Sequence, residues 1–116
     1  MSKVNWQSLT DIDQLEALKK QSYEQPVLIF KHSTSCPISA MALRTLEQDW
    51  NPEQESETAI FFLDLLRHRS VSNAVAESFG VTHQSPQVIV LKEGKAVYDE
   101  SHMGIRYEQL HSVVHA

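Results

Sequence analysis

Three short runs of consecutive apolar residues divide the chain. They cover residues 27–30, 60–63 and 88–91. A run of this length without polar alternation is typical of a strand buried on both faces of a sheet. Residues 96–98 follow the third run after Glu93-Gly94, a tight-turn pair, so the last two strands are expected to form a hairpin. Residues 6–9 are a candidate for a further, short edge strand.

Between the strands, apolar residues recur at three- and four-residue spacing, which predicts helices. The first helix is expected to begin at a cap, Thr10 or Asp11, and to place Ile12, Leu15 and Leu18 on one face. Three more helices are expected over residues 37–50, from a cap at Ser70 or Ser72 through Phe79, and over residues 107–115. Gly80 supplies the expected stop of the third helix.

Strands and helices alternate along the chain, so the sequence predicts an α/β fold in a single domain spanning residues 1–116. We expect a central mixed sheet of four to five strands with helices on both faces. The acidic, polar segment 51–58 is expected to be a solvated loop. Functional sites of such sheets lie at the carboxyl ends of parallel strands. Cys36 follows the strand that ends near Lys31, and therefore occupies that position.

Composition and net charge reduce the number of possible function classes. Ten basic and fifteen acidic side chains give a net charge of −5, which does not favour a nucleic-acid partner. No apolar run approaches the roughly 20 residues that span a bilayer, and residues 1–6 contain no apolar signal core. We therefore expect a cytoplasmic protein with no membrane partner. Cys36 is the single cysteine, which excludes an internal disulfide and fits a reducing compartment.

The residues around Cys36 indicate a reactive thiol. Pro37 follows it, and proline is favoured in the first turn of a helix. The dipole and free N–H groups of a helix N-terminus stabilise a thiolate, and the hydroxyls of Thr34, Ser35 and Ser39 offer further donors. A buried, inert cysteine is the ordinary alternative. The position between a strand and a helix, among polar neighbours, favours the catalytic nucleophile instead.

A second feature is Ser85-Pro86, directly before the strand at 88–91. Together with the strand–loop–helix around Cys36-Pro37-Ile38-Ser39 and the closing hairpin and helix, it resembles the thioredoxin/glutaredoxin superfamily. The resemblance implies a thioredoxin-like fold with a cis Ser85–Pro86 bond that faces Cys36, and a Ser85 backbone that pairs with substrate. The residues expected to bind substrate around Cys36 are Thr34, Ser35, Pro37, Ser39, Ser85 and Pro86. Base rates alone favour a trans bond, because only about 5–6% of X-Pro bonds are cis.

More closely, the stretch from Phe30 to Ser39, which reads Phe-Lys-His-Ser-Thr-Ser-Cys-Pro-Ile-Ser, resembles the YtxJ family of monothiol bacilliredoxins. The resemblance implies reduction of mixed disulfides between bacillithiol and cytosolic proteins. It also implies bacillithiol as co-substrate and no tightly bound cofactor. The residues alone indicate only thiol–disulfide exchange by one thiol. Ser39 stands where a dithiol enzyme has its second cysteine, so a low-molecular-weight thiol must resolve the Cys36 mixed disulfide. Ser39 either donates to the thiolate or is an ordinary helix residue.

Two other functions stay open. One is a monothiol glutaredoxin-like carrier of an iron–sulfur cluster, although such proteins usually have glycine where Pro37 stands. The other is a non-enzymatic thioredoxin-fold adaptor in a stress response. No metal site is expected, because no pair of histidines has a recognised ligand spacing with Cys36, and the six histidines are interpreted as surface residues. Arg67 and Arg69 either lie in a solvated loop, which we favour, or contact the carboxylates of bacillithiol.

Overall fold

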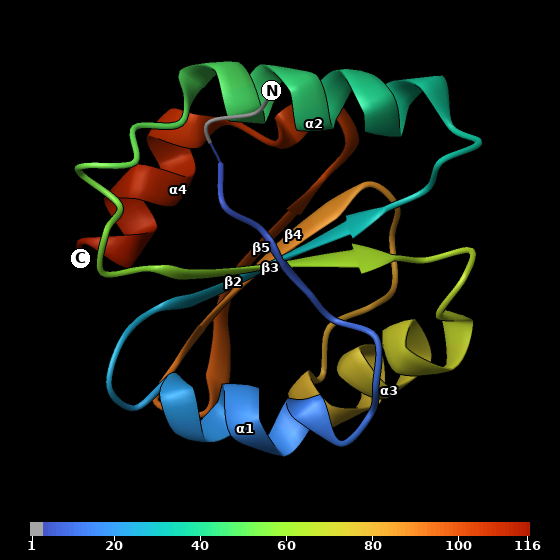
Figure 1. Ribbon diagram of the computed structural model, residues 1–116, viewed down its shortest axis with the longest axis horizontal. Helices are drawn as coiled ribbons and strands as arrows, with labels where there is room; N and C mark the ends of the chain where they lie inside the picture. Colours follow the sequence, from blue (N-terminus) through green and yellow to red (C-terminus); the bar gives the residue numbers. More distant parts are fainter. Residues whose placement is uncertain (1–3) are drawn as a thin grey trace.

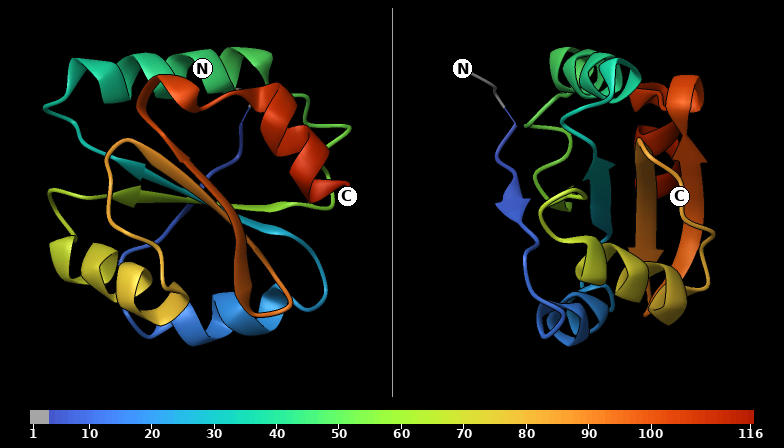
Figure 2. Two further views of the ribbon diagram at one scale, coloured as in Figure 1. Left: turned by 180° about the vertical axis from the view of Figure 1, so that it is seen from behind. Right: turned by 90° about the vertical axis from the view of Figure 1, so that its right-hand side faces the viewer.

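The apolar runs form the inner strands of a five-stranded sheet in a computed structural model that describes residues 4–116. In chain order the strands are β1 (Gln7–Ser8), β2 (Val27–His32), β3 (Ala59–Asp64), β4 (Gln87–Lys92) and β5 (Lys95–Ser101). Their order in the sheet is β1-β3-β2-β4-β5, which the right-hand view of Figure 2 shows edge-on. β1 and β2 run parallel to β3, whereas β4 is antiparallel to both β2 and β5. The predicted mixed sheet, its edge strand and its hairpin are confirmed.

Helices cover both faces of the sheet. They are α1 (Gln14–Gln21), α2 (Pro37–Asp49), α3 (Arg69–Phe79) and α4 (Tyr107–Val114), with a short 3-10 helix, η1 (His102–Gly104), before α4. α2 and α4 lie on one face and α1 and α3 on the other (Figure 1). None of these helices in residues 4–116 is long and apolar enough to cross a membrane. Residues 1–3, part of the segment searched for a signal core, lie outside the described residues.

The alternation of side chains along β2 builds two cores. Val27 and Ile29 pack in the cluster that includes Leu15 and Leu18 of α1 and Val71 and Val75 of α3. The intervening Leu28 and Phe30 pack in the cluster that includes Leu46 of α2 and Leu110 of α4. All four β2 side chains are fully buried. Burial on both faces explains why this strand reads as a continuous apolar run.

Three sequence predictions are wrong in detail. α1 begins at Gln14 with Asp13 as its N-cap, because the Gln14 side chain accepts the N–H groups of both Thr10 and Asp11 and holds that segment outside the helix. Ile12 is consequently half-exposed, at 49%. α3 begins at Arg69, ahead of both predicted caps, with His68 as its N-cap. Its end is as predicted, since Gly80 has a left-handed φ of +65°.

The third error concerns the segment 51–58, which is not uniformly solvated. Most of its side chains are exposed, but Glu55 is buried, at 4% exposure. Its carboxylate is held by side chains of α4, which is distant in sequence. A run of polar residues predicts a loop, but it does not indicate which of its side chains is buried by a contact with a distant segment.

Sheet topology brings three chain segments to one end of the molecule. Because β4 is antiparallel to β2, its first residue, Gln87, pairs with Lys31 near the end of β2. Gln87 also pairs with Ser101, the last residue of β5. The loop after β2, the Ser85–Pro86 segment before β4, and η1 after β5 therefore meet at this end, where α2 begins.

Candidate active site

Cys36 is the N-cap residue of α2, and Pro37 is the first residue of the helix, as predicted. The cysteine is half-buried, with an extended backbone conformation. Its N–H donates to the carbonyl oxygen of Ser33, with an N–O distance of 3.2 Å. Because Pro37 has no N–H, the first amide donors of the helix belong to Ile38 and Ser39. The helix N-terminus thus presents its dipole and these donors at the position of the only thiol.

Ser39 is fully buried and ties α2 to β2. Its Oγ accepts the N–H of Ser33 at 3.1 Å and shares a hydrogen bond with Nδ1 of His32 at 2.7 Å. His32 is itself buried, so the interpretation of this histidine as a surface residue is wrong. Burial lowers the pKa of His32 below its ordinary value, partly opposed by the charges of Asp64 and Glu47, so its imidazole is neutral at pH 7. These contacts give Ser39 a positioning role at the start of the helix.

The Ser85–Pro86 peptide bond is cis, as predicted. Pro86 is buried, and its carbonyl oxygen accepts the N–H of His102 at 3.1 Å, which links this segment to η1. The Oγ of Ser85 is buried and has no hydrogen-bond partner among residues 4–116. A buried hydroxyl without a partner costs about 1–3 kcal/mol. A ligand that supplied this partner would recover that energy on binding.

The other residues predicted to bind substrate lie on the surface. Thr34, Ser35 and Pro37 are exposed, and the Oγ atoms of Ser33 and Ser35 are 3.3 Å apart. These side chains flank Cys36 in sequence and are accessible to a ligand that approaches the thiol.

The basic residues after β3 are exposed as well. Arg67 lies in the turn and Arg69 is the first residue of α3. Asp64 accepts the backbone N–H of Arg67 at 3.4 Å, so this contact shapes the turn without engaging the guanidinium. Both residues have the exposure expected of a solvated loop.

Lys31 is a neighbour of the site that sequence reasoning missed. Its side chain is fully buried on the face covered by α1 and α3. Its Nζ donates to the carbonyl oxygen of Ser72 at 3.2 Å and lies 3.3 Å from Nδ1 of His83, in the loop before Pro86. Burial lowers the pKa of Lys31 to about 8. The available signal was the position of this lysine, directly after four apolar residues of a buried strand.

Apolar side chains of α2 and η1 offer a contact surface at the end of the molecule where α2 begins. Ile38, Met41 and Met103 are exposed at 43%, 53% and 70%. A small pocket of about 80 Å³ separates α2 from η1 and is lined by Met41, Ala42, Thr45, His102, Met103 and Ile105. Exposed apolar side chains grouped in this way are typical of a protein-binding surface.

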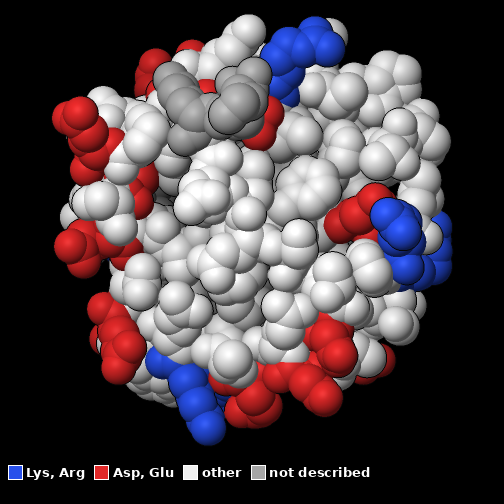
Figure 3. Space-filling view, in the orientation of Figure 1, with Lys and Arg blue, Asp and Glu red and all other residues white. Residues whose placement is uncertain are grey.

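The face of the molecule that carries the β1 edge has few charged side chains at its centre (Figure 3). Figure 3 shows a largely uncharged centre, with acidic side chains spread round the rim and basic ones in small groups. The net charge of −5 is therefore not gathered into one patch on this face.

Comparison with known proteins decides the family. The family model described as monothiol bacilliredoxin BrxC matches residues 7–110 of the chain. The chain belongs to this family. The match includes Cys36, Ser39 and the Ser85–Pro86 segment, so the resemblance inferred from the sequence is confirmed. A BrxC bacilliredoxin with a single cysteine is a thioredoxin-fold oxidoreductase that works through one thiol.

Solved structures agree with this assignment. A candidate oxidoreductase with a thioredoxin fold is 28% identical, with a TM-score of 0.77, and the match covers 94% of this chain and 92% of that one. The thioredoxin of Malassezia sympodialis is 13% identical, with a TM-score of 0.74 and coverage of 99% and 92%. The thioredoxin of Trypanosoma brucei brucei is 11% identical, with a TM-score of 0.74 and coverage of 97% and 93%. The two thioredoxins share the fold with this bacilliredoxin.

Proposed function

We propose that this bacilliredoxin removes bacillithiol from protein mixed disulfides in the cytoplasm, with Cys36 as the nucleophile. The observation that carries the proposal is the combination of a single, half-buried thiol at the N-terminus of α2 with a buried serine three residues later. The thiol is placed to attack a disulfide. Because residue 39 is serine, the helix has no second thiol that could complete the exchange internally.

The first step is attack by the Cys36 thiolate on the bacillithiol sulfur of the mixed disulfide. The target sulfur leaves as a thiolate and takes a proton from water, while Cys36 becomes disulfide-bonded to bacillithiol. The thiolate attacks this sulfur because it is the more accessible one, whereas the target sulfur is hindered by its own protein. Thr34, Ser35 and Ser85 offer hydroxyl groups to the bound small thiol, and Pro86 forms the platform beside it.

The second step regenerates Cys36. A second bacillithiol, as its thiolate, attacks the bacillithiol sulfur bound to Cys36. The Cys36 thiolate leaves, and the two small thiols depart joined by a disulfide. Each cycle consumes one free bacillithiol and one target mixed disulfide, and releases the target thiol and one bacillithiol disulfide, so turnover requires free thiol and no bound cofactor.

The apolar side chains around Cys36 suit target proteins as substrates. Ile38 and Met41 of α2 are exposed, as is Met103 of η1, which lines a pocket together with Met41, and a target surface docked at the start of α2 would cover them. Burying apolar area stabilises the complex by about 25 cal/mol for each Å² removed from water. The grouping of these side chains therefore favours a protein-bound mixed disulfide over a free small-molecule disulfide.

The test uses a bacillithiolated model protein and mass spectrometry. With free bacillithiol present, the wild-type chain should remove the adduct over many turnovers; without it, the reaction should stop after one equivalent with the adduct on Cys36. Cys36→Ser should abolish the reaction, whereas Ser112→Ala, at an exposed position of α4, is the control and should keep it. Multiple turnovers without any added thiol would contradict the scheme.

The same experiment separates the other functions. No removal of the adduct by the wild-type chain, with free bacillithiol present, would support a non-enzymatic adaptor, and full removal by Cys36→Ser would exclude Cys36 as the nucleophile. Visible absorbance from an iron–sulfur cluster after anaerobic reconstitution, lost in Cys36→Ser, would support the cluster carrier. Pro37 at the first position of α2 does not favour that outcome.

A further inference from the structure

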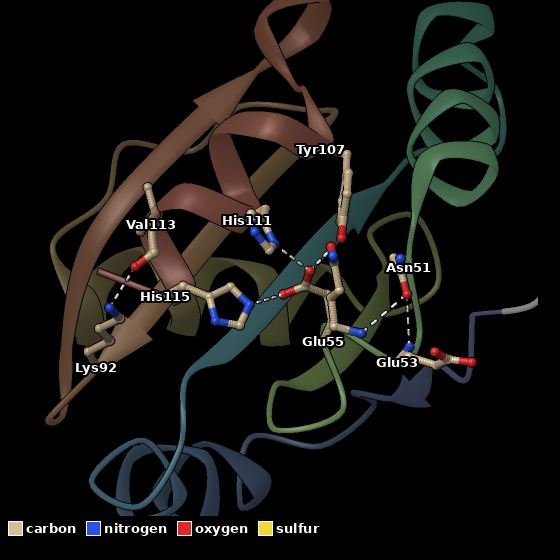
Figure 4. A network of polar contacts seen from close by, with 9 residues as sticks. Asn51, Glu53, Glu55, Lys92, Tyr107, His111, Val113 and His115 are labelled. Atoms are coloured by element: carbon tan, nitrogen blue, oxygen red, sulfur yellow. Dashed lines mark hydrogen bonds and ion pairs between the residues drawn. The ribbon is translucent and has the colours of Figure 1, made fainter.

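A second cluster of chemically capable side chains lies away from Cys36. Glu55, in the loop between α2 and β3, contacts His111 of α4 and His115, the C-cap residue of that helix, as Figure 4 shows. Oε2 of Glu55 is 2.7 Å from Nδ1 of His111, and its Oε1 is 2.8 Å from Nε2 of His115. The hydroxyl of Tyr107 donates to Oε2. The thiol chemistry proposed for Cys36 uses none of these groups.

The cluster lies at the opposite end of α2 from Cys36. α2 has 13 residues, which corresponds to about 20 Å of helix. Cys36 precedes its first residue, whereas the loop with Glu55 follows its last, and Figure 1 shows α4 beside this C-terminal end. The cluster therefore belongs to neither the nucleophile nor the surface around it.

We propose that Glu55, His111 and His115 form a binding site for a zinc ion. The two histidines are four residues apart, His111 in the last turn of α4 and His115 at its C-cap, and the N–H of His115 donates to the carbonyl oxygen of His111 at 3.2 Å, so both imidazoles can reach a single ion. Two imidazoles and a carboxylate are a donor set that zinc accepts with a water in its fourth position. Imidazole ligands exclude the magnesium and calcium classes of site, which use oxygen donors.

The geometry requires only a small rearrangement. One donor atom from each of the three side chains lies within 4.8 Å of the other two. Around a tetrahedral zinc ion, with ligand bonds of about 2.0–2.2 Å, neighbouring donor atoms are about 3.3 Å apart. The N–O distances of 2.7 and 2.8 Å must therefore open by about half an ångström. The ion would replace the protons that now join the imidazoles to the carboxylate.

One of the three proposed ligands is buried and the other two are partly exposed to solvent. The Glu55 side chain is fully buried, whereas those of His111 and His115 are 38% and 44% exposed. Contacts with Tyr107, His111 and His115 hold the Glu55 carboxylate toward the two imidazoles. The exposed imidazoles give an ion a path from solvent, and Tyr107 holds the carboxylate in orientation from outside the ligand set.

Bound zinc would join the loop after α2 to α4. Both segments are held at present by hydrogen bonds that water competes for at the exposed imidazoles. An ion that binds the folded chain and not the unfolded one stabilises the fold in proportion to its affinity. Bound zinc would therefore raise the stability of the fold, and its occupancy should not depend on the thiol.

The test measures zinc binding in a Cys36→Ser background, which removes the only thiol ligand. Titration of the metal-free protein against a chromophoric zinc chelator should give one ion per chain, and zinc should raise Tm. His115→Asn should weaken binding by about 100-fold or more, since loss of even an outer contact costs 10–100-fold. The matched control is His102→Asn, an exposed histidine outside the cluster, which should bind as its parent does.

A second measurement identifies the geometry. Cobalt titrated in place of zinc should develop the visible absorption bands of a four-coordinate ion, and these should be absent in His115→Asn. Magnesium should neither compete nor change Tm. Zinc binding of equal strength in His115→Asn, or no binding by the parent, would overturn the proposal and leave the cluster as a hydrogen-bonded support for a buried carboxylate.

Discussion

Lys31 should destabilise the fold at neutral pH, and replacing it with methionine should stabilise the protein. The lysine lies in the central strand β2, fully buried, with hydrogen bonds to the Ser72 carbonyl and to His83. Methionine has a similar length and needs no hydrogen-bond partner, so Lys31→Met keeps the volume and removes the charge. The change tests whether the burial of this ammonium group is as costly as its surroundings indicate.

The magnitude follows from the pKa. Burial lowers the pKa of Lys31 from 10.5 to about 8, and each pKa unit corresponds to about 1.4 kcal/mol, so the charge costs roughly 3 kcal/mol at pH 7. Two lost hydrogen bonds, each worth about 1 kcal/mol, offset about 2 kcal/mol of this. We therefore expect Lys31→Met to raise the free energy of unfolding by about 1 kcal/mol at pH 7.

The sign of the pH dependence provides a second check. Between pH 8 and 10.5 the folded chain has released the Lys31 proton and the unfolded chain still binds it, so the wild-type free energy of unfolding rises with pH. The advantage of Lys31→Met should therefore shrink over this range.

Denaturant titrations at pH 7 and pH 10 measure both effects. Lys19→Met, at an exposed position of α1, is the matched control and should change stability by less than about 0.5 kcal/mol at either pH. If Lys31→Met were less stable than wild type at pH 7, or if its advantage were the same at both values, the reasoning from burial would be refuted.

Three further variants probe the site. Because burial lowers the pKa of His32, the wild-type protein should lose stability as the pH falls below 6.5, and His32→Asn should flatten this acid limb in denaturant titrations; an unchanged limb would contradict the assignment. Ser39→Ala removes the hydroxyl that joins His32 to Ser33, so it should lower the free energy of unfolding by about 1–3 kcal/mol while the rate of bacillithiol removal falls modestly at most. Ser85→Ala should not lower Tm, because its Oγ has no partner within residues 4–116, but it should raise KM for the mixed disulfide several-fold; an unchanged KM would remove Ser85 from the binding site.

Local patterns determined most of the architecture. The apolar runs at β2, β3 and β4 are long enough, and free enough of polar residues, to specify strands buried on both faces, and Gly80 and Gly94 supply the left-handed backbone conformations that end α3 and turn the hairpin. Cys36 at the boundary between a strand and a helix is likewise a local signal. The predicted start of α1 was too early. The side chain of Gln14, the first residue of the helix, accepts the N–H groups of Thr10 and Asp11, and the sequence favours these two residues as caps without indicating that contact.

Only the tertiary structure decided the polar contacts between segments that are distant in sequence. Glu55 was expected in a solvated loop, and His111 and His115 on the surface, because each residue type is usually exposed. Their meeting depends on how α4 docks beside the end of α2, which no local pattern records. The partner of Lys31 is likewise distant in sequence. The alternation of side chains along β2 sets the face on which Lys31 lies, but the carbonyl oxygen that accepts its ammonium N–H belongs to Ser72 of α3, 41 residues away. Hydrophobic periodicity specifies faces, whereas a buried charge depends on the individual partner that the fold brings to it.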